Sequence, residues 1–262
     1  MITISFFLEK TVKQKPETPD PQYDWTPGAE AQTESEIDTF FHSPEIEKLK
    51  ELICDIGQRL WQRAYVDGNG GNLSIRVGDN LVLGTPTMIS KGHMKTTDMC
   101  LVDMEGTQLA GTRARSSEVM THIGIMKRQP QAKACIHAHP PTATGFAIAG
   151  IAPPRFLTPE GEVFVGEAGL APFCRPGSAE MSDVVGRVGT DHVAVMMVHH
   201  GIITRAFHLE MAYWRMENLE AYCVSYLAAR QALANEKEEV PQISGDDAEY
   251  LSSIYDWMTA RR

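Results

Sequence analysis

The stretch "CIHAHPPTA" (Cys135–Ala143) decides how this chain is interpreted. Its apolar start predicts a buried β-strand, and the two prolines end the strand because proline cannot donate to a sheet ladder. Side chains at i and i+2 leave a strand on the same face, so His137 and His139 point the same way. The strand rise places them about 7 Å apart, which is more than two ligands of one Zn²⁺ need, but twisting at the strand end and the Pro140-Pro141 stop can close this gap. Two histidines on one face of a strand end are candidate ligands for a metal ion.

A second histidine pair, His199 and His200, ends another apolar run, "HVAVMMVHHG" (192–201). We expect this run to form a fully buried strand. Successive strand residues face opposite sides, so only one of the pair can join His137 and His139 easily. A catalytic Zn²⁺ typically has three protein ligands and one open position. The alternative interpretation is that these histidines are ordinary polar residues at strand ends.

Helical and extended patterns alternate around these two runs. Helix periodicity, with Ser43 as N-cap and Pro44 at the first helical position, opens the folded part of the chain. The predicted helices are 43–65, 116–130, 140–150, 178–188, 208–233 and 245–260. The predicted strands are 72–77 and 80–84 (a hairpin), 99–106, 132–139, 162–166 and 192–201. This alternation predicts an α/β domain with helices over both faces of a central sheet.

Composition excludes several classes of protein. The chain has 262 residues, of which 43% are hydrophobic, which is enough for a sizeable core. Its net charge of -10 argues against nucleic acid as a partner, because a phosphate backbone needs a basic surface. No run approaches the roughly 18 apolar residues of a membrane span, and the first residues lack the basic segment of a signal peptide. Five scattered cysteines favour reduced thiols, so we expect a cytoplasmic protein.

The first 42 residues differ from the rest. They are rich in Pro, Glu, Thr and Gln and show no apolar period, which predicts a flexible or loosely docked N-terminal extension. Trp25 and Phe40–Phe41 are candidate local anchors. We therefore divide the chain into an extension, 1–42, and one folded domain, 43–262.

Two more stretches carry candidate site residues. Ser116, Ser117 and Glu118 open a predicted helix; they are either a simple N-cap or an anion site with Glu118 aimed at a neighbouring metal. His122 shares a helix face with Glu118 and is expected to pack or hydrogen-bond rather than bind metal. The segment "GNGGNLS" (68–74) is either a flexible turn or a loop that brings backbone N–H groups close to a phosphate. It is neither a P-loop nor a dinucleotide fingerprint.

Six landmarks occur in order between about residues 44 and 235: "GGNLS", "TPT…SKG", "SSE", "HAHPP", "APFCRPGS" and "HHG". In this order they resemble the class II aldolase and adducin family, which includes L-fuculose-1-phosphate aldolase and L-ribulose-5-phosphate 4-epimerase. The resemblance implies a three-layer α/β/α catalytic domain over 43–262. It also implies a homotetramer with active sites between subunits and a small-molecule sugar phosphate as substrate.

The resemblance assigns roles to the candidate residues. It implies that His137, His139 and His200 bind Zn²⁺, with His200 chosen over His199 because the family's third histidine directly precedes the glycine. Glu118 would be the acid/base and an occasional metal ligand. The substrate phosphate would be held by Gly71, Asn72, Thr87, Ser116 and Ser117. Mn²⁺, Co²⁺ or Fe²⁺ would suit imidazole and carboxylate ligands as well as Zn²⁺.

The implied reaction is reversible cleavage of a ketose 1-phosphate into dihydroxyacetone phosphate and an aldehyde. A Zn²⁺ Lewis acid would stabilise the enediolate, and a carboxylate beside it would move protons. Alternatives are dehydration, decarboxylation or 4-epimerisation at the same metal site, or a non-catalytic binding module like the adducin head domains, which lack the metal histidines. Lys91 is a candidate Schiff-base residue, but its "SKG" context looks like a surface loop in this family.

Two positions depart from the family pattern. Met88 follows Thr87 where the family usually has a glycine, and its side chain is expected to crowd the phosphate pocket. The fuculose-phosphate enzymes also carry a tyrosine ahead of the "AP" landmark that assists proton transfer, and it is absent here. Thr158 stands near the expected place, and Glu160 or Glu162 is a candidate substitute.

Overall fold

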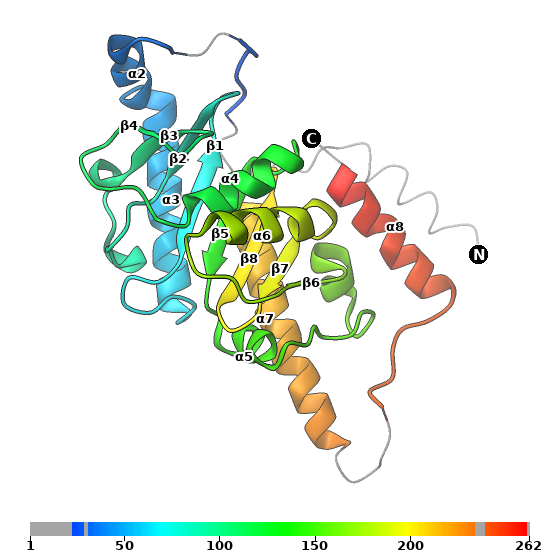
Figure 1. Cartoon of the computed structure of the whole chain (residues 1–262). Helices are drawn as coiled ribbons and strands as arrows, with labels where there is room; N and C mark the ends of the chain where they lie inside the picture. The colour runs from blue at the N-terminus through cyan, green and yellow to red at the C-terminus, as the bar shows by residue number, and fades with distance from the viewer. Residues whose placement is uncertain (1–22, 29–30, 234–238, 261–262) are drawn as a thin grey trace.

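A computed structural model of the protein describes residues 23–28, 31–233 and 239–260. Within these residues, the centre is an eight-stranded mixed sheet in the order β4-β3-β2-β1-β5-β8-β7-β6 (Figure 1). Neighbouring strands are antiparallel except β6 and β7, which are parallel. The strands are β1 (Asn72–Arg76), β2 (Leu81–Gly84), β3 (Cys100–Asp103), β4 (Gln108–Ala110), β5 (Ala134–Ala138), β6 (Gly169–Ala171), β7 (Ala194–Met197) and β8 (Gly201–Ala206).

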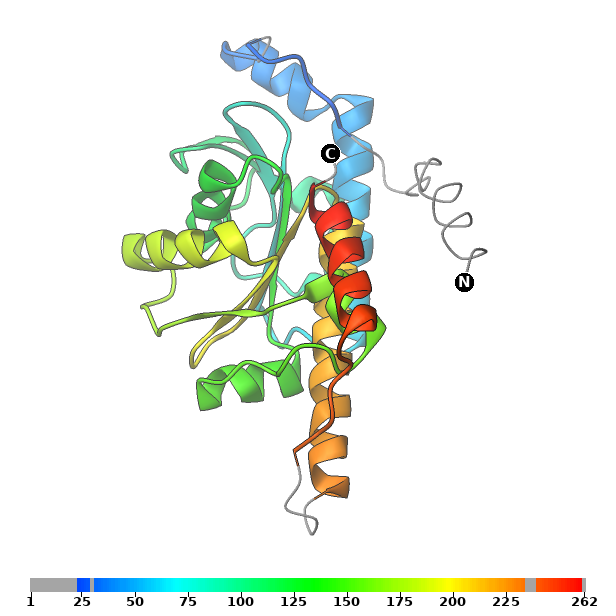
Figure 2. The ribbon, with the colours of Figure 1, turned by 90° about the vertical axis from the view of Figure 1, so that its right-hand side faces the viewer.

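Helices cover both faces of this sheet. Figure 2 shows α3 (Pro44–Gln62) and α7 (Leu209–Ala232) on one face, and α4 (Val119–Arg128) and α6 (Ala179–Asp191) on the other. Each face buries its own apolar cluster, one holding the side chains of α3 and α7 and the other those of α4 and α6. The remaining described helices include α2 (Glu34–Phe41), α5 (Pro141–Ala149) and α8 (Asp246–Ala260). The predicted three-layer α/β/α architecture is confirmed.

Local sequence signals explain where the helices begin. The Ser43 side chain accepts a hydrogen bond from the Ile46 N–H, with Pro44 at the first helical position, and Ser178 caps α6 in the same way. A side-chain oxygen at this position satisfies an N–H group that has no partner within the helix. Both helix starts were predicted from the sequence and are confirmed.

The strand predicted at 162–166 is wrong. Residues Gly161–Val165 form a single π-helical turn, η3, closed by a hydrogen bond from the Gly166 N–H to the Gly161 carbonyl. This turn packs against α7 and α8, and the parallel edge strand β6 begins only afterwards, at Gly169. A short apolar run does not distinguish a buried turn from a strand, which explains the error.

The strand predicted over 192–201 is confirmed only for Ala194–Met197, and a turn and a second strand follow it. β7 ends at Met197, His199 and His200 lie in a tight turn, and β8 begins at Gly201 and returns antiparallel. His199 adopts the left-handed conformation, with φ of 58°, which reverses the chain. β8 was not predicted, yet it is the strand that joins β5 to β7.

Described residues of the predicted extension contact the domain. The Trp25 indole N–H donates to Asp79 at 2.9 Å, and the Phe41 side chain is buried. Residues 31–42 include the helix α2, which was not predicted. Residues 1–22 and 29–30 of the extension lie outside the described residues, so the division of the chain at residue 42 stays a prediction.

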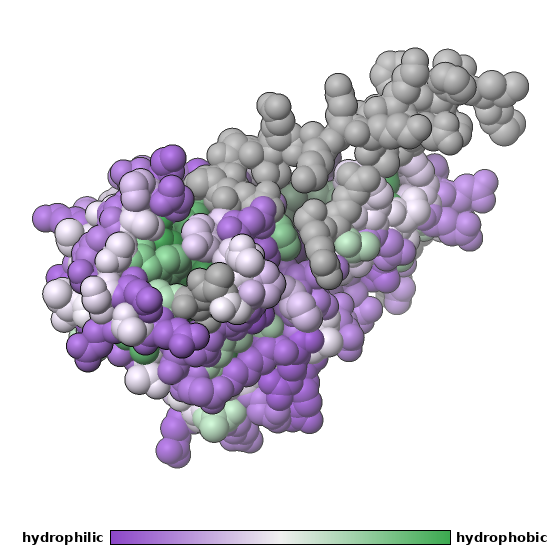
Figure 3. All heavy atoms as spheres, turned by 90° about the horizontal axis from the view of Figure 1, so that it is seen from above, coloured by the Kyte–Doolittle hydropathy of each residue, from purple (hydrophilic) through white to green (hydrophobic). Residues whose placement is uncertain are grey.

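The surface is mostly polar. Seen from above in Figure 3, it is largely hydrophilic, with one apolar area framed by polar side chains. A cavity of about 800 Å³ lies between α2 and β4, with Ile37, Phe41 and Leu109 among its lining residues. No helix in the described part of the chain is long and apolar enough to span a membrane. All five cysteines are free thiols, as predicted.

Candidate metal centre

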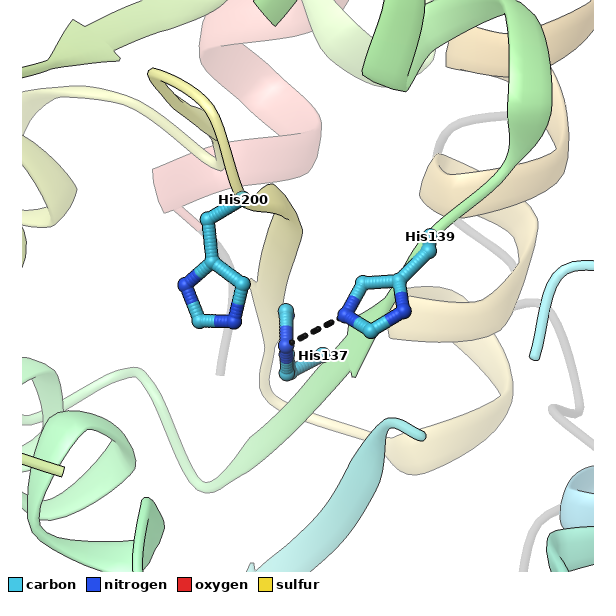
Figure 4. A group of neighbouring side chains, drawn as sticks. All are labelled: His137, His139 and His200. Atoms are coloured by element: carbon cyan, nitrogen blue, oxygen red, sulfur yellow. Dashed lines mark hydrogen bonds between the residues drawn. The ribbon is translucent and has the colours of Figure 1, made fainter. Parts of the chain in front are cut away.

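Three histidines converge where β5 ends and β8 begins. His137 lies in β5, His139 follows the last residue of that strand, and His200 lies in the turn before β8; their rings face one another in Figure 4. One ring nitrogen from each lies within 4.8 Å of the others. Antiparallel pairing of Ala138 with Ile202 brings the two segments together. The structure thus places the three predicted ligands at one point and leaves His199 outside their group.

The side chains of His137 and His139 come closer together than the strand rise of about 7 Å, as the strand end and the Pro140-Pro141 stop predicted. Their Nε2 atoms lie 3.1 Å apart, because the strand stops at Ala138 and the chain then turns. Gly201 makes room for this approach. A Cβ atom at Gly201 would lie 2.7 Å from the Ala138 carbonyl oxygen and would collide with the His139 ring. The glycine of "HHG" is therefore a steric requirement of the histidine cluster.

A hydrogen bond to the backbone fixes which ring nitrogen of His137 is free to bind a metal ion. Its Nδ1 lies 2.8 Å from the Ile202 carbonyl oxygen, which can only accept, so Nδ1 carries the proton. Burial lowers the pKa of His137 to about 3, so the ring is neutral and Nε2 presents a lone pair. That lone pair faces Nε2 of His139. The His139 Nε2 can donate to it in one tautomer and can share a cation with it in the other, and Zn–N bonds of 2.0–2.1 Å suit the 3.1 Å spacing of the two nitrogens.

Glu118 is the carboxylate of the cluster. It occupies the N-cap position of α4, with Oε1 3.3 Å from His200 Nε2 and Oε2 3.5 Å from His137 Nε2. Asn72 donates to Oε2 at 3.0 Å. Burial opposes ionisation of Glu118, but the hydrogen bond to His200 and the nearby His137 outweigh it and lower the pKa of the carboxyl. The group is therefore ionised near neutral pH, ready to ligate a cation or accept a proton.

Residues predicted to hold a phosphate gather beside Glu118. The Glu118 N–H donates to Ser116 Oγ at 3.2 Å, and the Ser116 N–H donates to the Thr85 carbonyl. The Thr87 N–H donates to the Ala114 carbonyl at 2.9 Å, which fixes Thr87 alongside the same segment. Asn72, at the start of β1, completes the group through its bond to Glu118. Asn72 and Ser116 thus both hydrogen-bond to Glu118, the carboxylate next to the histidines.

Two more predicted residues frame this region. Gly71 has φ of 71°, and a Cβ atom there would lie 2.7 Å from the His137 carbonyl oxygen, so no other residue fits without a shift. The backbone of Ser117 lies against Gly177 of the "APFCRPGS" landmark. Landmarks distant in the sequence therefore meet around one site.

The family model described as Class II Aldolase and Adducin N-terminal domain matches residues 51–227. The chain belongs to this class II aldolase family. It is 34% identical over 172 residues to an L-fuculose phosphate aldolase of Methanococcus vannielii, an alignment that covers 66% of this chain and 91% of that protein. It is 31% identical over 175 residues to a 3-oxo-tetronate 4-phosphate decarboxylase of Haemophilus influenzae, with 65% and 83% covered.

Solved structures agree with the class II aldolase fold. An Escherichia coli protein described as a candidate aldolase, epimerase or decarboxylase superposes with a TM-score of 0.71. The match covers 79% of this chain and 98% of that one, at 24% identity. Class II aldolases use a divalent metal, and the three histidines of this chain form a group that fits one.

Lys91 corrects the interpretation of the "SKG" landmark in this member of the class II aldolase family. It was predicted in a surface loop, but its side chain is 1% exposed, and Nζ donates to the Asn69 and Ile89 carbonyls at 3.0 and 2.8 Å. Burial lowers the pKa of Lys91 to about 8. A glycine inside α3, Gly57, was the available signal: a Cβ atom there would lie 2.7 Å from the Lys91 carbonyl oxygen.

Met88 preserves the backbone of the glycine it replaces. Its φ of 55° lies in the left-handed region, which a glycine adopts without strain. The side chain is 75% exposed, and its Sδ accepts a hydrogen bond from Asn69 Nδ2 at 3.4 Å. Met88 therefore rests on the glycine-rich loop beside the predicted phosphate residues rather than being buried among them.

Glu162 and Glu160, the candidate substitutes for the missing tyrosine, lie in different environments. The Glu162 side chain is buried and binds Arg155 through Nε, at 3.1 Å, and through Nη2. Glu160 is exposed at the start of η3. Both carboxylate oxygens of Glu162 are therefore engaged by Arg155, and Glu162 is not free to take the place of the tyrosine.

Proposed function

We propose that this protein is a metal-dependent carbon–carbon lyase that cleaves a ketose 1-phosphate into dihydroxyacetone phosphate and an aldehyde. The observation that carries the proposal is the group of three imidazoles with an ionised carboxylate beside it. Hydroxyl and amide side chains suited to an anion lie directly next to that group. A polarising centre, a base and an anion site are the parts that such a cleavage requires.

His137, His139 and His200 would hold the divalent ion, with Zn²⁺ the first choice. When bound there, the ion supplies a Lewis acid for the carbonyl and neighbouring hydroxyl oxygens of the substrate. Glu118, oriented by Asn72, takes a proton from the substrate and returns it to carbon. The substrate phosphate would be held by Gly71, Asn72, Thr87, Ser116 and Ser117. The relatives named above act on phosphorylated compounds, which supports this assignment.

The resemblance to the family supports the remaining parts of the proposal. Residues 43–262 would form the catalytic domain of a cytoplasmic homotetramer with active sites between subunits. Size-exclusion chromatography with light scattering tests the assembly directly: a tetramer is expected, and a monomer at assay concentration would contradict it.

Decarboxylation of a related sugar-acid phosphate is the second candidate, and two observations favour it. A decarboxylase is among the relatives, at 31% identity. The chain also lacks the proton-transfer tyrosine, and Glu162 is engaged by Arg155. Aldol cleavage must remove a hydroxyl proton before the bond breaks, whereas a carboxylate substrate is already ionised. Decarboxylation therefore needs one proton transfer fewer.

The test uses zinc-loaded protein, with a chelated sample and Glu118→Gln as controls. One arm measures dihydroxyacetone phosphate released from a panel of ketose 1-phosphates, and the other measures CO₂ released from 3-oxo-tetronate 4-phosphate. Chelator-sensitive release of dihydroxyacetone phosphate supports aldol cleavage. CO₂ release alone supports the second candidate. Protein that binds no stoichiometric metal would contradict both and favour a non-catalytic, adducin-like module.

A further inference from the structure

Asp67 lies behind the candidate metal centre, at the start of the glycine-rich loop that follows α3. Its Oδ1 is 3.3 Å from Nδ1 of His139. Asp67 is outside the group of side chains that could share one ion. Its contact is with a ligand ring and not with the ligand position.

The contact selects one form of the His139 ring. The two imidazole nitrogens point in different directions, and Nε2 of His139 is the one that faces His137. A carboxylate only accepts hydrogen bonds, so Asp67 favours the proton on Nδ1 of His139. In a neutral ring the lone pair is then on Nε2, on the side of the ion. Without such a partner, the proton could occupy Nε2 and block the ligand position.

The loop is built around this contact. The His139 N–H donates to the Tyr65 carbonyl at 2.7 Å, so the short segment 65–67 holds both the backbone and the ring of His139. The Gly70 N–H donates to the Asp67 carbonyl at 2.6 Å and closes a turn. A Cβ atom at Gly70 would lie 2.7 Å from Asp67 Oδ1 and 3.1 Å from His139 Nδ1. Only glycine leaves the space that the pair occupies.

At His137, the backbone takes the place that Asp67 has at His139. Its Nδ1 is fixed by a backbone carbonyl inside the sheet, that of Ile202. His139 lies beyond the end of β5, and the partner of its Nδ1 in the described part of the chain is the Asp67 side chain, not a strand carbonyl. Its orientation therefore depends on a side chain.

We propose that Asp67 is a positioning residue that holds His139 in the metal-binding tautomer and orientation, and so raises the affinity of the site for a divalent ion. The proposal rests on the metal site assigned above. Carboxylates behind ligating histidines typically contribute 10- to 100-fold in metal affinity. The Asp67 side chain is 89% exposed, which places the expected effect at the lower end, about tenfold.

The experiment measures Zn²⁺ affinity of the full chain by competition with a chromophoric chelator, with no substrate present. Asp67→Ala is expected to weaken binding about tenfold. Asp67→Asn keeps an accepting oxygen and should recover most of this loss. Asp79→Ala is the matched control, because it removes another loop carboxylate that accepts hydrogen bonds from Trp25 and Gly28. Its Zn²⁺ affinity should stay within about twofold of the unmodified protein.

A double-mutant cycle shows whether the effect passes through His139. In the His139→Ala background, Asp67→Ala should change Zn²⁺ affinity by less than about twofold, because the partner ring is gone. ¹⁵N NMR of the histidine rings in metal-free protein should show the Nδ1–H tautomer for His139 and lose that preference in Asp67→Ala.

Three results would overturn the proposal. These are unchanged affinity in Asp67→Ala, an equal loss in the His139→Ala background, and an equal loss in Asp67→Asn. If the unmodified protein binds no Zn²⁺, the metal site itself is wrong. Binding without catalysis contradicts only the assigned reaction, because this assay needs no substrate.

Discussion

Acidification should destabilise this protein through His122, a histidine buried between α4 and Ser74 of β1. His122 lies on α4, one turn after Glu118, and is 1% exposed. Its Nδ1 lies 2.7 Å from Ser74 Oγ, and its Nε2 has no hydrogen-bond partner among the described residues. His122 is thus buried and hydrogen-bonded, which is the environment predicted for it from the sequence. Burial lowers the pKa of His122 to about 4, against 6.5 for an ordinary histidine.

The sign follows from proton uptake. Between pH 6.5 and 4 the unfolded chain binds a proton at residue 122 and the folded chain does not, so acid favours unfolding. The contribution of His122 is complete above pH 6.5 and is lost as the pH falls toward 4. At about 1.4 kcal/mol per pKa unit, the full loss is about 3 kcal/mol, and between pH 7.5 and 4.5 it is about 2 to 3 kcal/mol.

The assay is urea unfolding of metal-free protein at pH 7.5 and pH 4.5, followed by circular dichroism at fixed protein concentration. His122→Asn removes the titration while keeping an oxygen that can accept from Ser74. The drop in unfolding free energy between the two pH values should be smaller by about 2 kcal/mol in this variant. His42→Asn is the control, since that side chain is 61% exposed. Equal pH dependence in His122→Asn and the unmodified protein would refute the reasoning.

Three further outcomes are expected. Glu118→Gln should lower kcat at least about 100-fold by removing the base, with metal content unchanged by elemental analysis; a loss under tenfold would contradict its role. Met88→Gly should lower KM for a phosphorylated substrate and shift the unfolding free energy by less than about 1 kcal/mol, and an unchanged KM would place Met88 outside the phosphate site. Lys91→Met should raise KM because it removes the hydrogen bond from Lys91 Nζ that holds the loop at the Asn69 carbonyl. Lys50→Met, which removes an equally buried lysine bound to the Phe41 carbonyl, should cost similar stability, about 2 kcal/mol, and leave KM unchanged. An equal change in KM in Lys91→Met and Lys50→Met would contradict the expectation for Lys91.

Much of the fold could be predicted because its signals are local. Caps at Ser43 and Ser178 and the long apolar period of α7 act within a few turns of helix, so they are visible in the sequence. The failures are places where tertiary contacts decide. The turn at His199 depends on β8 pairing with both β5 and β7, and η3 depends on packing against α8. Neither contact has a local signal.

The residues of the candidate site could also be predicted from the sequence only in part. His137, His139 and His200 were found from spacing and landmark order, and the structure brings them together. Their close approach, however, requires the chain to leave the strand after Ala138. The burial of Lys91 could not be found from its neighbours, because it is created by the close packing of η1 (Lys91–His93) on α3.

The landmarks of this family are recognisable because steric fit fixes them. Gly71 and Gly201 border the histidine cluster so closely that a Cβ atom at either would collide with it. Positions without that constraint are free to vary, and Met88 and the 158–162 segment are where this chain departs from the fuculose-phosphate pattern. We therefore expect metal binding to depend on the sterically fixed residues and reaction type to depend on the others. Exchanging the 158–162 segment between an aldolase and a decarboxylase of this family should then move the ratio of the two activities while leaving Zn²⁺ affinity unchanged.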